Sequence, residues 1–323
     1  MKAIVQDVYG SADVLELRDI ARPVPREGEV LIRVRAAGID QGVWHLMTGL
    51  PYLVRLFGYG LKKPKVPVRG REVAGVVEAV GGGVTRFAAG DEVYGTCDGS
   101  FAEYVCAKED KVARKPASLS FEEAAAAPIS AVTALQAVRD AGEITVGQKV
   151  LIIGAGGGVG SFAVQLAKAF GAEVTGVCST GKVELVRSLG ADAVIDYTKS
   201  DIAAAGMLYD VILDMAGNRR LSVLRAALAP KGRLVIVGGE GGGKLTGGFE
   251  RSLRAPFASL FSGQKLKGLV AKETHLDLEA LASLIDAGSV KPAVDKVFPL
   301  AEAPAAIQYL REGRARGKVV VRV

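Results

Sequence analysis

Two hydrophobic periodicities divide the chain near Phe121. Before that point, apolar and polar residues alternate in segments such as Glu29 to Ala36, and glycines and prolines separate these segments. Short strands spaced in this way predict a small barrel or sandwich. After it, an alanine-rich helical pattern from Glu122 to Arg139, with Ser120 as a suitable N-cap, opens a series of alternating strand and helix patterns. This alternation predicts a doubly wound parallel sheet.

The expected strands and helices follow these two hydrophobic patterns to the end of the sequence. Strands are expected at 73–80, 150–153, 173–178, 193–195, 211–213, 233–237, 266–270 and 318–323. Helices are expected at 159–170, 182–189, 278–287 and 303–312. The chain is therefore predicted to be an α/β protein, with a β-rich first part and a doubly wound second part.

Composition narrows the class of protein. The 323 residues suffice for two domains, and 49% hydrophobic and 24% charged residues are ordinary for a globular protein. Cys97, Cys106 and Cys178 are scattered, so neither a disulfide framework nor a zinc ribbon is expected. Unpaired cysteines are typical of a reducing compartment, so a cytoplasmic location is expected. We expect no signal peptide and no membrane span, because no run approaches about 18 apolar residues. The net charge of +6 is spread along the chain, which argues against nucleic-acid binding.

The strongest chemical signal lies between Val150 and Ala172. An apolar strand runs into a glycine-rich turn, Gly154 to Gly160, and a helix with an apolar stripe follows at once. Glycines allow the backbone to approach a pyrophosphate, and the helix N-terminus offers unpaired N–H groups. A tight turn without a ligand is the alternative, but the strand and helix on either side favour a dinucleotide site.

The residues after the next expected strand select between two dinucleotides. An NAD site usually has an acidic residue about 20 residues after the glycines. This chain has Ser179, Thr180 and Lys182 there, and these side chains suit a 2′-phosphate. The pattern favours NADP(H), although Lys182 could also be a solvated lysine at a helix start.

Several longer stretches resemble one family. They are GREVAGVVEAVGGGVTRFAAGDEVYG (70–95), GSFAEYVCAKEDKVARKP (99–116), GAGGGVG (154–160) and LGADAVIDY (189–197). Together they resemble the medium-chain dehydrogenase/reductase superfamily, and within it the zinc-free quinone oxidoreductase branch. The resemblance implies a GroES-like β-barrel catalytic domain, 1–122 completed by 272–323, and a Rossmann NADP-binding domain, 123–271. It also implies a homodimer joined through an edge of the Rossmann sheet.

The resemblance assigns cofactor contacts by position. Lys182 and Tyr197 fall near the 2′-phosphate, and Thr133 falls near the nicotinamide amide. The remaining positions are the phosphate loop and its neighbours, the loops that wrap the cofactor, and a strand end beside the nicotinamide: Gly156, Gly157, Gly158, Val159, Gly160, Ser179, Thr180, Asn218, Gly238, Gly239, Leu269 and Val270.

The departures from zinc-dependent relatives concern the metal ligands. Asp40 stands where they have a cysteine, Arg71 where they have a histidine, and Ile129 and Ser130 where the third ligand is expected. Zinc needs three or four N, S or O ligands at fixed geometry, so no metal site is expected.

Without a metal to act as a Lewis acid, hydride transfer favours acceptors that are already electron-poor, such as quinones and α,β-unsaturated carbonyls. Candidate hydrogen-bond donors to the developing oxyanion lie between Ile39 and Gly49, where Trp44 has an indole N–H and His45 a titratable imidazole. Asp40 and His45 stand where the quinone reductase branch has an asparagine and a tyrosine, and these replacements bear on substrate preference. Asp40, Trp44 and His45 are therefore the candidate catalytic residues. The structural alternative is a wedged aromatic ring and a satisfied histidine.

Three functions stay open at this point. They are an NADPH-dependent reductase of quinones or enones, a metal-free carbonyl reductase, and a cofactor-binding protein without turnover. The substrate is expected to be a small hydrophobic carbonyl or quinone. The segment Leu50 to Val66 could be a lid, a partner-facing helix or simple surface packing.

Overall fold

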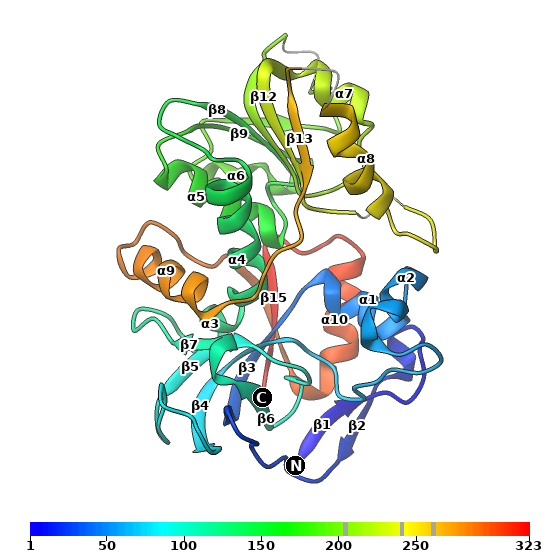
Figure 1. Ribbon diagram of the computed structural model, residues 1–323, viewed down its shortest axis with the longest axis vertical. Helices are drawn as coiled ribbons and strands as arrows, with labels where there is room; N and C mark the ends of the chain where they lie inside the picture. The colour runs from blue at the N-terminus through cyan, green and yellow to red at the C-terminus, as the bar shows by residue number, and fades with distance from the viewer. Residues whose placement is uncertain (203–205, 240–241, 260–262) are drawn as a thin grey trace. The chain divides into compact units, whose positions relative to one another are not determined.

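The computed structural model describes residues 1–202, 206–239, 242–259 and 263–323. The contacts divide the chain into two units (Figure 1). Unit 1 comprises Met1–Val132, Glu273–Gly288 and Pro292–Val323, and unit 2 comprises Thr133–Lys272 and Ser289–Lys291. The first division lies within helix α4 (Pro128–Gln136), whereas the sequence boundary was placed after residue 122.

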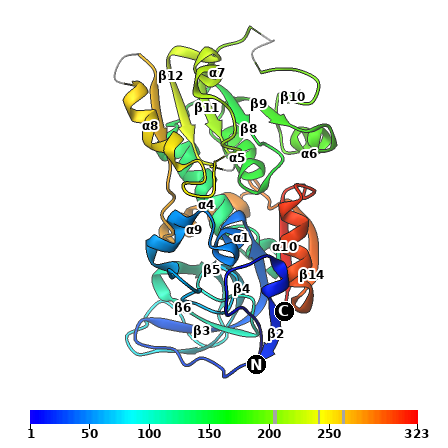
Figure 2. The same cartoon turned by 90° about the vertical axis from the view of Figure 1, so that its right-hand side faces the viewer.

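Unit 2 is built on a six-stranded parallel sheet. Its order is β10 (Ala193–Asp196), β9 (Glu173–Cys178), β8 (Lys149–Ile153), β11 (Tyr209–Asp214), β12 (Leu228–Ile236) and β13 (Lys265–Gly268). Numbered along the unit, this is 3-2-1-4-5-6, the order of a dinucleotide-binding fold. Figure 2 shows the strands from β12 to β10 in this sequence. The order reverses between β8 and β11, and ligands of such sheets bind outside the carboxyl ends of the strands at that point.

Helices cover both faces of this sheet, as the doubly wound prediction requires. Figure 1 shows α5 (Gly158–Ala169) and α6 (Val183–Ser188) on one side, and α7 (Leu221–Ala226) and α8 (Phe249–Ser259) on the other. The apolar run of β8 is fully buried, which explains why it is continuous rather than alternating. α8 also lies against β13, since the Ser259 hydroxyl accepts from the N–H of Leu266 at 2.7 Å and donates to its carbonyl at 3.2 Å.

Unit 1 contains a sheet with the order β14 (Val294–Pro299), β15 (Lys318–Arg322), β3 (Glu29–Ile39), β4 (Glu72–Val80), β5 (Glu92–Thr96) and β7 (Val112–Arg114). β6 (Tyr104–Lys108) pairs with the first half of β3, and β15 pairs with its second half. A separate pair joins β1 (Lys2–Val5) and β2 (Glu16–Asp19). The C-terminal strand thus returns to the N-terminal unit.

The helices of unit 1 are α1 (Gln41–Thr48), α2 (Tyr52–Val54), α3 (Phe121–Ala125), the first part of α4, α9 (His275–Asp286) and α10 (Ala303–Arg311). One core cluster packs α1 and α10 against β3 and β15, and a second fills the space between β3, β4 and β5. No helix in the described part of the chain is long and apolar enough to cross a bilayer.

The prediction of one continuous helix from Glu122 to Arg139 is wrong. The helix stops at Ala125 and a new one begins at Pro128. Proline lacks an N–H and disfavours helical geometry in the residue before it, so the alanine-rich run breaks there. The N-cap is confirmed, because Ser120 and Glu123 form a capping box. The strand expected at 266–270 ends at Gly268, so Leu269 and Val270 follow it.

Candidate functional site

The glycine-rich turn joins β8 to α5 at the point where the strand order reverses. The N–H groups of Gly154 and Ala155 both donate to the carbonyl of Val177 in β9 at 3.0 Å. Gly157 is the N-cap of α5, a helix of 12 residues, so the first N–H groups of that helix lack partners within it. A Cβ on Gly160 would lie 2.1 Å from the carbonyl oxygen of Gly154, which requires glycine there. The turn therefore fits a pyrophosphate.

Lys182 lies against this turn. It is the last residue of a short 3-10 turn, Thr180–Lys182, whose N-cap is Ser179, directly after β9. A Cβ built on Gly156 would lie 2.8 Å from the Cβ of Lys182. The structure thus brings Lys182 against Gly156 in the glycine turn, although the two residues lie 26 positions apart in the sequence (182 − 156).

A carboxylate that the sequence interpretation missed adjoins the same place. The Thr180 hydroxyl donates to Asp196 at 2.6 Å, and the Thr198 hydroxyl donates to it at 2.7 Å. These hydrogen bonds lower the pKa of Asp196 to about 2. Asp196 ends β10, the strand beside β9, so the available signal was that the carboxyl ends of neighbouring parallel strands lie together. Tyr197 follows it, with 54% of its surface exposed.

The loops after β11 and β12 meet at a second cluster of glycines. Fully buried Asp214 accepts from the N–H of Gly217 at 2.9 Å and from Arg251 at 2.8 Å. A Cβ on Gly217 would lie 2.0 Å from the carbonyl oxygen of Gly238, so two loops pack backbone to backbone. This places Gly238 and Gly239 beside the loop that carries Asn218. Sequence reasoning did not assign Asp214 or Arg251 to this part of the sheet edge.

The other predicted cofactor positions are located on their elements only. Thr133 lies half-buried in α4. The N–H of Leu269 donates to the carbonyl of Ile236 at 2.8 Å, which continues the pairing of β13 with β12 for one residue. Val270 follows with 78% of its surface exposed.

The three candidate catalytic residues lie in α1 and at its N-cap, where they have structural partners. Asp40 is the N-cap, with one carboxylate oxygen accepting from the N–H of Val43 at 3.1 Å. The guanidinium of Arg311 lies 4.0 Å from the ring centre of Trp44, which packs on the core. A ring nitrogen of His45 is 2.7 Å from the carbonyl oxygen of Leu50. These contacts match the alternative interpretation, in which Trp44 is a wedged aromatic ring and His45 a hydrogen-bonded histidine.

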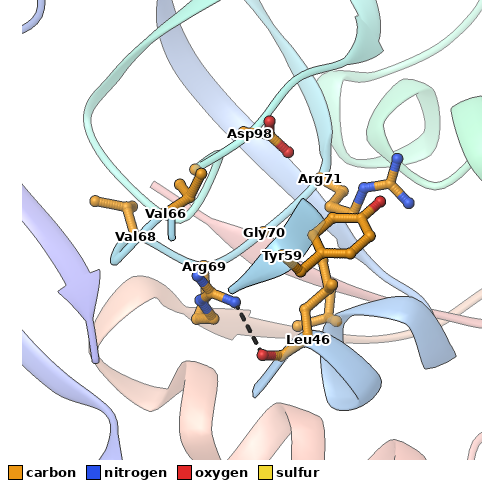
Figure 3. A pocket seen from close by; sticks show the side chains of 10 residues that line it. Leu46, Tyr59, Val66, Val68, Arg69, Gly70, Arg71 and Asp98 are labelled. Carbon is orange, nitrogen blue, oxygen red and sulfur yellow. Dashed lines mark hydrogen bonds between the residues drawn. The ribbon is translucent and has the colours of Figure 1, made fainter. Parts of the chain in front are cut away.

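A different face of α1 lines a pocket in unit 1. Figure 3 shows this pocket, with Leu46 and Tyr59 on one side and Val66 and Val68 on the other. Arg69 and Arg71 flank Gly70 at its base, and Val43 also contributes. Val43 and Leu46 are three residues apart and share a helical face, whereas Trp44 and His45 point elsewhere. Sequence reasoning missed this lining because α1 was not among the expected helices.

The positions that hold zinc in other relatives are engaged by other groups. Arg71 forms an ion pair with Glu273. Burial lowers the pKa of Arg71, but the carboxylates of Glu273 and Asp40 outweigh burial and raise it. The Ser130 hydroxyl accepts from the ammonium of Lys318 at 3.0 Å. Within the described residues, histidines, cysteines and carboxylates form no group of three that could hold a metal ion.

Lys318 also forms an ion pair with Glu72, and both side chains are buried. The N–H of Ile129 donates to the other oxygen of Glu72 at 2.9 Å. Burial raises the pKa of Glu72 to about 7, while Lys318 opposes this shift. The pair joins β4 to β15 and to the start of α4.

The segment from Leu50 to Val66 contacts Tyr9 through Arg55 and Gly60 and is largely exposed between these two residues. The hydroxyl of Tyr9 is 2.6 Å from the carbonyl oxygen of Gly60, and Arg55 lies over the Tyr9 ring at 4.4 Å. Leu56 and Phe57 are 70% and 64% exposed. Surface packing against Tyr9 accounts for Arg55 and Gly60, and the apolar side chains of Leu56 and Phe57 between them face solvent.

Comparison with known proteins decides the family. The chain is 36% identical to a 2-methylene-furan-3-one reductase of Solanum lycopersicum, over 99% of this chain and 79% of that protein. The chain belongs to the medium-chain dehydrogenase/reductase superfamily, in its quinone oxidoreductase-like branch. It is also 35% identical to a chloroplastic NADPH-dependent alkenal/one oxidoreductase of Arabidopsis thaliana, over 99% of this chain and 79% of that protein.

Solved structures of this superfamily confirm the fold class, a GroES-like domain with a Rossmann sheet. An NAD-dependent alcohol dehydrogenase matches with a TM-score of 0.85 and 31% identity over 100% of both chains. The quinone oxidoreductase of Coxiella burnetii matches with a TM-score of 0.84 and 29% identity over 100% of this chain and 99% of that one.

Two family models match parts of this superfamily member. An alcohol dehydrogenase GroES-like domain matches residues 26–117, and a zinc-binding dehydrogenase matches residues 189–321. The second match does not include Asp40, Arg71, Ile129 or Ser130, the positions that bear on a catalytic metal.

Proposed function

We propose that the chain is an NADPH-dependent reductase of quinones or α,β-unsaturated carbonyls that works without zinc. The observation that carries the proposal is the glycine turn between β8 and α5, with Lys182 against Gly156. The similarity to an enone reductase, an alkenal/one oxidoreductase and a quinone oxidoreductase supports this choice of substrate class.

The chain's own residues divide the work of holding the cofactor. The turn from Gly156 to Gly160 would receive the pyrophosphate through backbone N–H groups. Ser179, Thr180 and Lys182, with Tyr197 nearby, would hold the 2′-phosphate. We propose that Thr133, Asn218, Gly238, Gly239, Leu269 and Val270 hold the nicotinamide end. When bound, NADPH supplies a hydride, and the protein supplies orientation and electrostatic stabilisation.

The absence of a catalytic metal is part of the proposal. A guanidinium at position 71 carries a fixed positive charge, and it would repel a divalent cation. Ser130 is engaged by Lys318, and one oxygen of Asp40 caps α1. We keep Asp40, Trp44 and His45 as candidates for contact with substrate, with Asp40 the strongest because its second carboxylate oxygen is buried and has no partner among the described residues.

A second candidate is a metal-free carbonyl reductase that makes an alcohol. The similarity to an NAD-dependent alcohol dehydrogenase favours it. Product identity separates the two candidates, because an enone reductase yields a saturated ketone and a carbonyl reductase yields an allylic alcohol.

The test is NADPH oxidation followed at the nicotinamide absorbance with 1,4-benzoquinone, 9,10-phenanthrenequinone and 2-cyclohexenone. Each acceptor is supplied with and without a chelator, and the series is repeated with NADH. We expect turnover that prefers NADPH and survives the chelator. Loss of activity with chelator would overturn the metal-free proposal. NADPH binding without turnover on any acceptor would make the chain a cofactor binder.

We also propose a cytoplasmic homodimer with the two domains assigned above. All three cysteines are free, which suits a reducing compartment. Light scattering on the purified protein tests the oligomeric state, with a mass of twice 33.6 kDa expected.

A further inference from the structure

Several buried polar atoms around Arg71 have no hydrogen-bond partner among the described residues. They are Nε of Arg69, Nε of Arg71, Oδ2 of Asp40, Oγ1 of Thr96 and Oγ of Ser100. A buried polar atom without a partner costs about 1–3 kcal/mol, so such a concentration needs an explanation. Both arginines line the pocket of Figure 3, and Thr96 and Arg71 line the pocket next to it.

Arg69 is a buried cation without a carboxylate partner among the described ion pairs. Only 5% of its surface is exposed, and one terminal nitrogen donates to the carbonyl oxygen of Leu46 at 3.2 Å. Burial lowers the pKa of Arg69 to about 10, so it is still charged at neutral pH. A desolvated guanidinium is costly unless an anion compensates it.

Arg71 adds a second fixed charge. One terminal nitrogen pairs with Glu273, while Nε has no partner in the described part of the chain. Gly70, at φ +93°, bends the chain between the two arginines, and a Cβ there would lie 2.4 Å from the Ser100 hydroxyl. Asp98 also lines the pocket, and Glu273 and Asp40 lie near Arg71, whereas no carboxylate pairs with Arg69 among the described ion pairs.

The volumes of the two pockets limit the size of the group that Arg69 and Arg71 could contact. The pocket between Arg69 and Arg71 measures about 20 Å³, and a single water needs about 10–15 Å³. It therefore admits one group the size of an oxygen atom. A neighbouring pocket of about 380 Å³ shares Tyr59, Arg71 and Asp98 with it, and that volume suits the body of a small molecule.

We propose that Arg69 and Arg71 bind an anionic oxygen of the substrate. This inference rests on the proposed function. Two sources share the chemistry. One is the oxygen that becomes negative during reduction. A hydride leaves bound NADPH, which is oxidised to NADP⁺, and forms a C–H bond at the β-carbon of an enone. The C=C electrons form a double bond to the carbonyl carbon, and the C=O π electrons move to the oxygen as an enolate. Water then protonates the α-carbon, becomes hydroxide, and the C=O bond re-forms. The other source is a carboxylate carried by the substrate. Guanidinium groups placed at either oxygen stabilise it.

Kinetics of arginine variants distinguish the sources. The variants are Arg71→Lys, Arg71→Gln and Arg69→Gln, and the acceptors are 2-cyclohexenone and the carboxylate-bearing enone trans-4-oxo-2-pentenoate. Arg86→Gln is the matched control, because Arg86 pairs with Glu279 as Arg71 pairs with Glu273, but it lines neither pocket. Thermal unfolding of each variant verifies that it folds.

Stabilisation of a developing oxyanion predicts that Arg71→Gln lowers kcat with both acceptors by about 10²–10³-fold, and that Arg71→Lys restores part of it. Binding of a substrate carboxylate predicts instead that KM rises at least about 10-fold for the acid alone. If both arginine variants match Arg86→Gln with both acceptors, the proposal is wrong.

A binding experiment makes the result independent of turnover. Trp44 is the only tryptophan and follows Val43, which lines the pocket, so its fluorescence can report occupancy. We expect benzoate to bind the wild type and Arg86→Gln, Arg71→Gln to bind it at least about 10-fold more weakly, and benzamide to bind none of them tightly. Equal benzoate affinity in all variants would contradict the proposal. A wild type that binds benzoate through Arg71 yet oxidises no NADPH would refute the proposed function and leave the anion site standing.

Discussion

Lys182 and Asp196 carry opposite charges at the edge where β9 and β10 end. Lys182 packs on the glycine turn, while Asp196 accepts from Thr180 at 2.6 Å. With its pKa lowered to about 2, Asp196 is ionised at any physiological pH. A 2′-phosphate placed here is attracted by the ammonium group and repelled by the carboxylate. In the proposed site, preference for NADPH over NADH would therefore depend on the balance between the charges of Lys182 and Asp196.

Substitution of each charge should move that preference in opposite directions. We expect Lys182→Ala to raise KM for NADPH about 10–100-fold, since a hydrogen bond to a charged group contributes about 1.5–3 kcal/mol, with little change for NADH. Asp196→Asn should lower KM for NADPH. Initial rates with both coenzymes measure this. An equal loss with NADPH and NADH would assign Lys182 to the pyrophosphate or to the fold instead.

At the scale of single residues, the sequence predicted which chemical groups are present better than it predicted where their side chains point. Lys182 was identified because a lysine stands where an acid is usual. Trp44 and His45 were predicted from residue type and from their position in the family resemblance, whereas the phase of α1 turns Val43 and Leu46 to the pocket. That phase depends on where the helix begins, and the N-cap, Asp40, was interpreted as chemistry rather than as a helix start.

At the scale of elements, the strand–turn–helix unit depends on one close approach. A Cβ on Gly160 would lie 2.1 Å from the Gly154 carbonyl oxygen and 2.8 Å from the Cα of Ala155, so neither neighbour can move without displacing the turn. We expect Gly160→Ala to weaken NADPH binding at least about 10-fold and to lower Tm. Fluorescence titration and thermal unfolding measure both effects. Gly82→Ala is the control, because nothing lies within 4 Å of its Cβ. Unchanged affinity in Gly160→Ala would show that the turn does not hold the cofactor.

The buried pair of Glu72 and Lys318 joins three elements that are far apart in sequence. Removal of one partner leaves an uncompensated charge in the core, so Glu72→Gln or Lys318→Met should each destabilise the protein by about 3–5 kcal/mol. The double variant Glu72→Gln/Lys318→Met combines the two substitutions and removes both charges, and we expect it to recover much of that loss. Urea unfolding of the four proteins measures the coupling. Additive losses would mean that the two side chains do not stabilise each other.

At the scale of the whole molecule, features that depend on neighbouring residues in the sequence were predicted, and features that depend on contacts between distant residues were not. The two periodicities gave the β-rich and doubly wound parts, because period two and period 3.6 are local signals. The pairing of β15 with β3 and the approach of Asp196 to Thr180 are long-range contacts that no local pattern carries. The break before Pro128 was local, but the alanine-rich run around it masked the proline.

All predicted cofactor residues, from Thr133 to Val270, belong to unit 2, whereas Asp40, Trp44 and His45 belong to unit 1. Saturation with NADPH at about 100 times its Kd stabilises the state that binds it by about 2.7 kcal/mol. We therefore expect NADPH to slow amide exchange most in the turn from Gly154 to Gly160 and in β8 and β9, and much less in β4 and β5 of unit 1. Hydrogen–deuterium exchange with mass spectrometry, with and without NADPH, measures this by peptide.

Lys182→Ala at the same NADPH concentration is the control, because weaker binding should reduce the protection in unit 2 in proportion. Protection concentrated in unit 1 would place the dinucleotide away from the glycine turn and would contradict the cofactor assignment. Protection confined to unit 2 in the wild type, and diminished in Lys182→Ala, would link the glycine turn, the 2′-phosphate residues and the parallel sheet in one binding event.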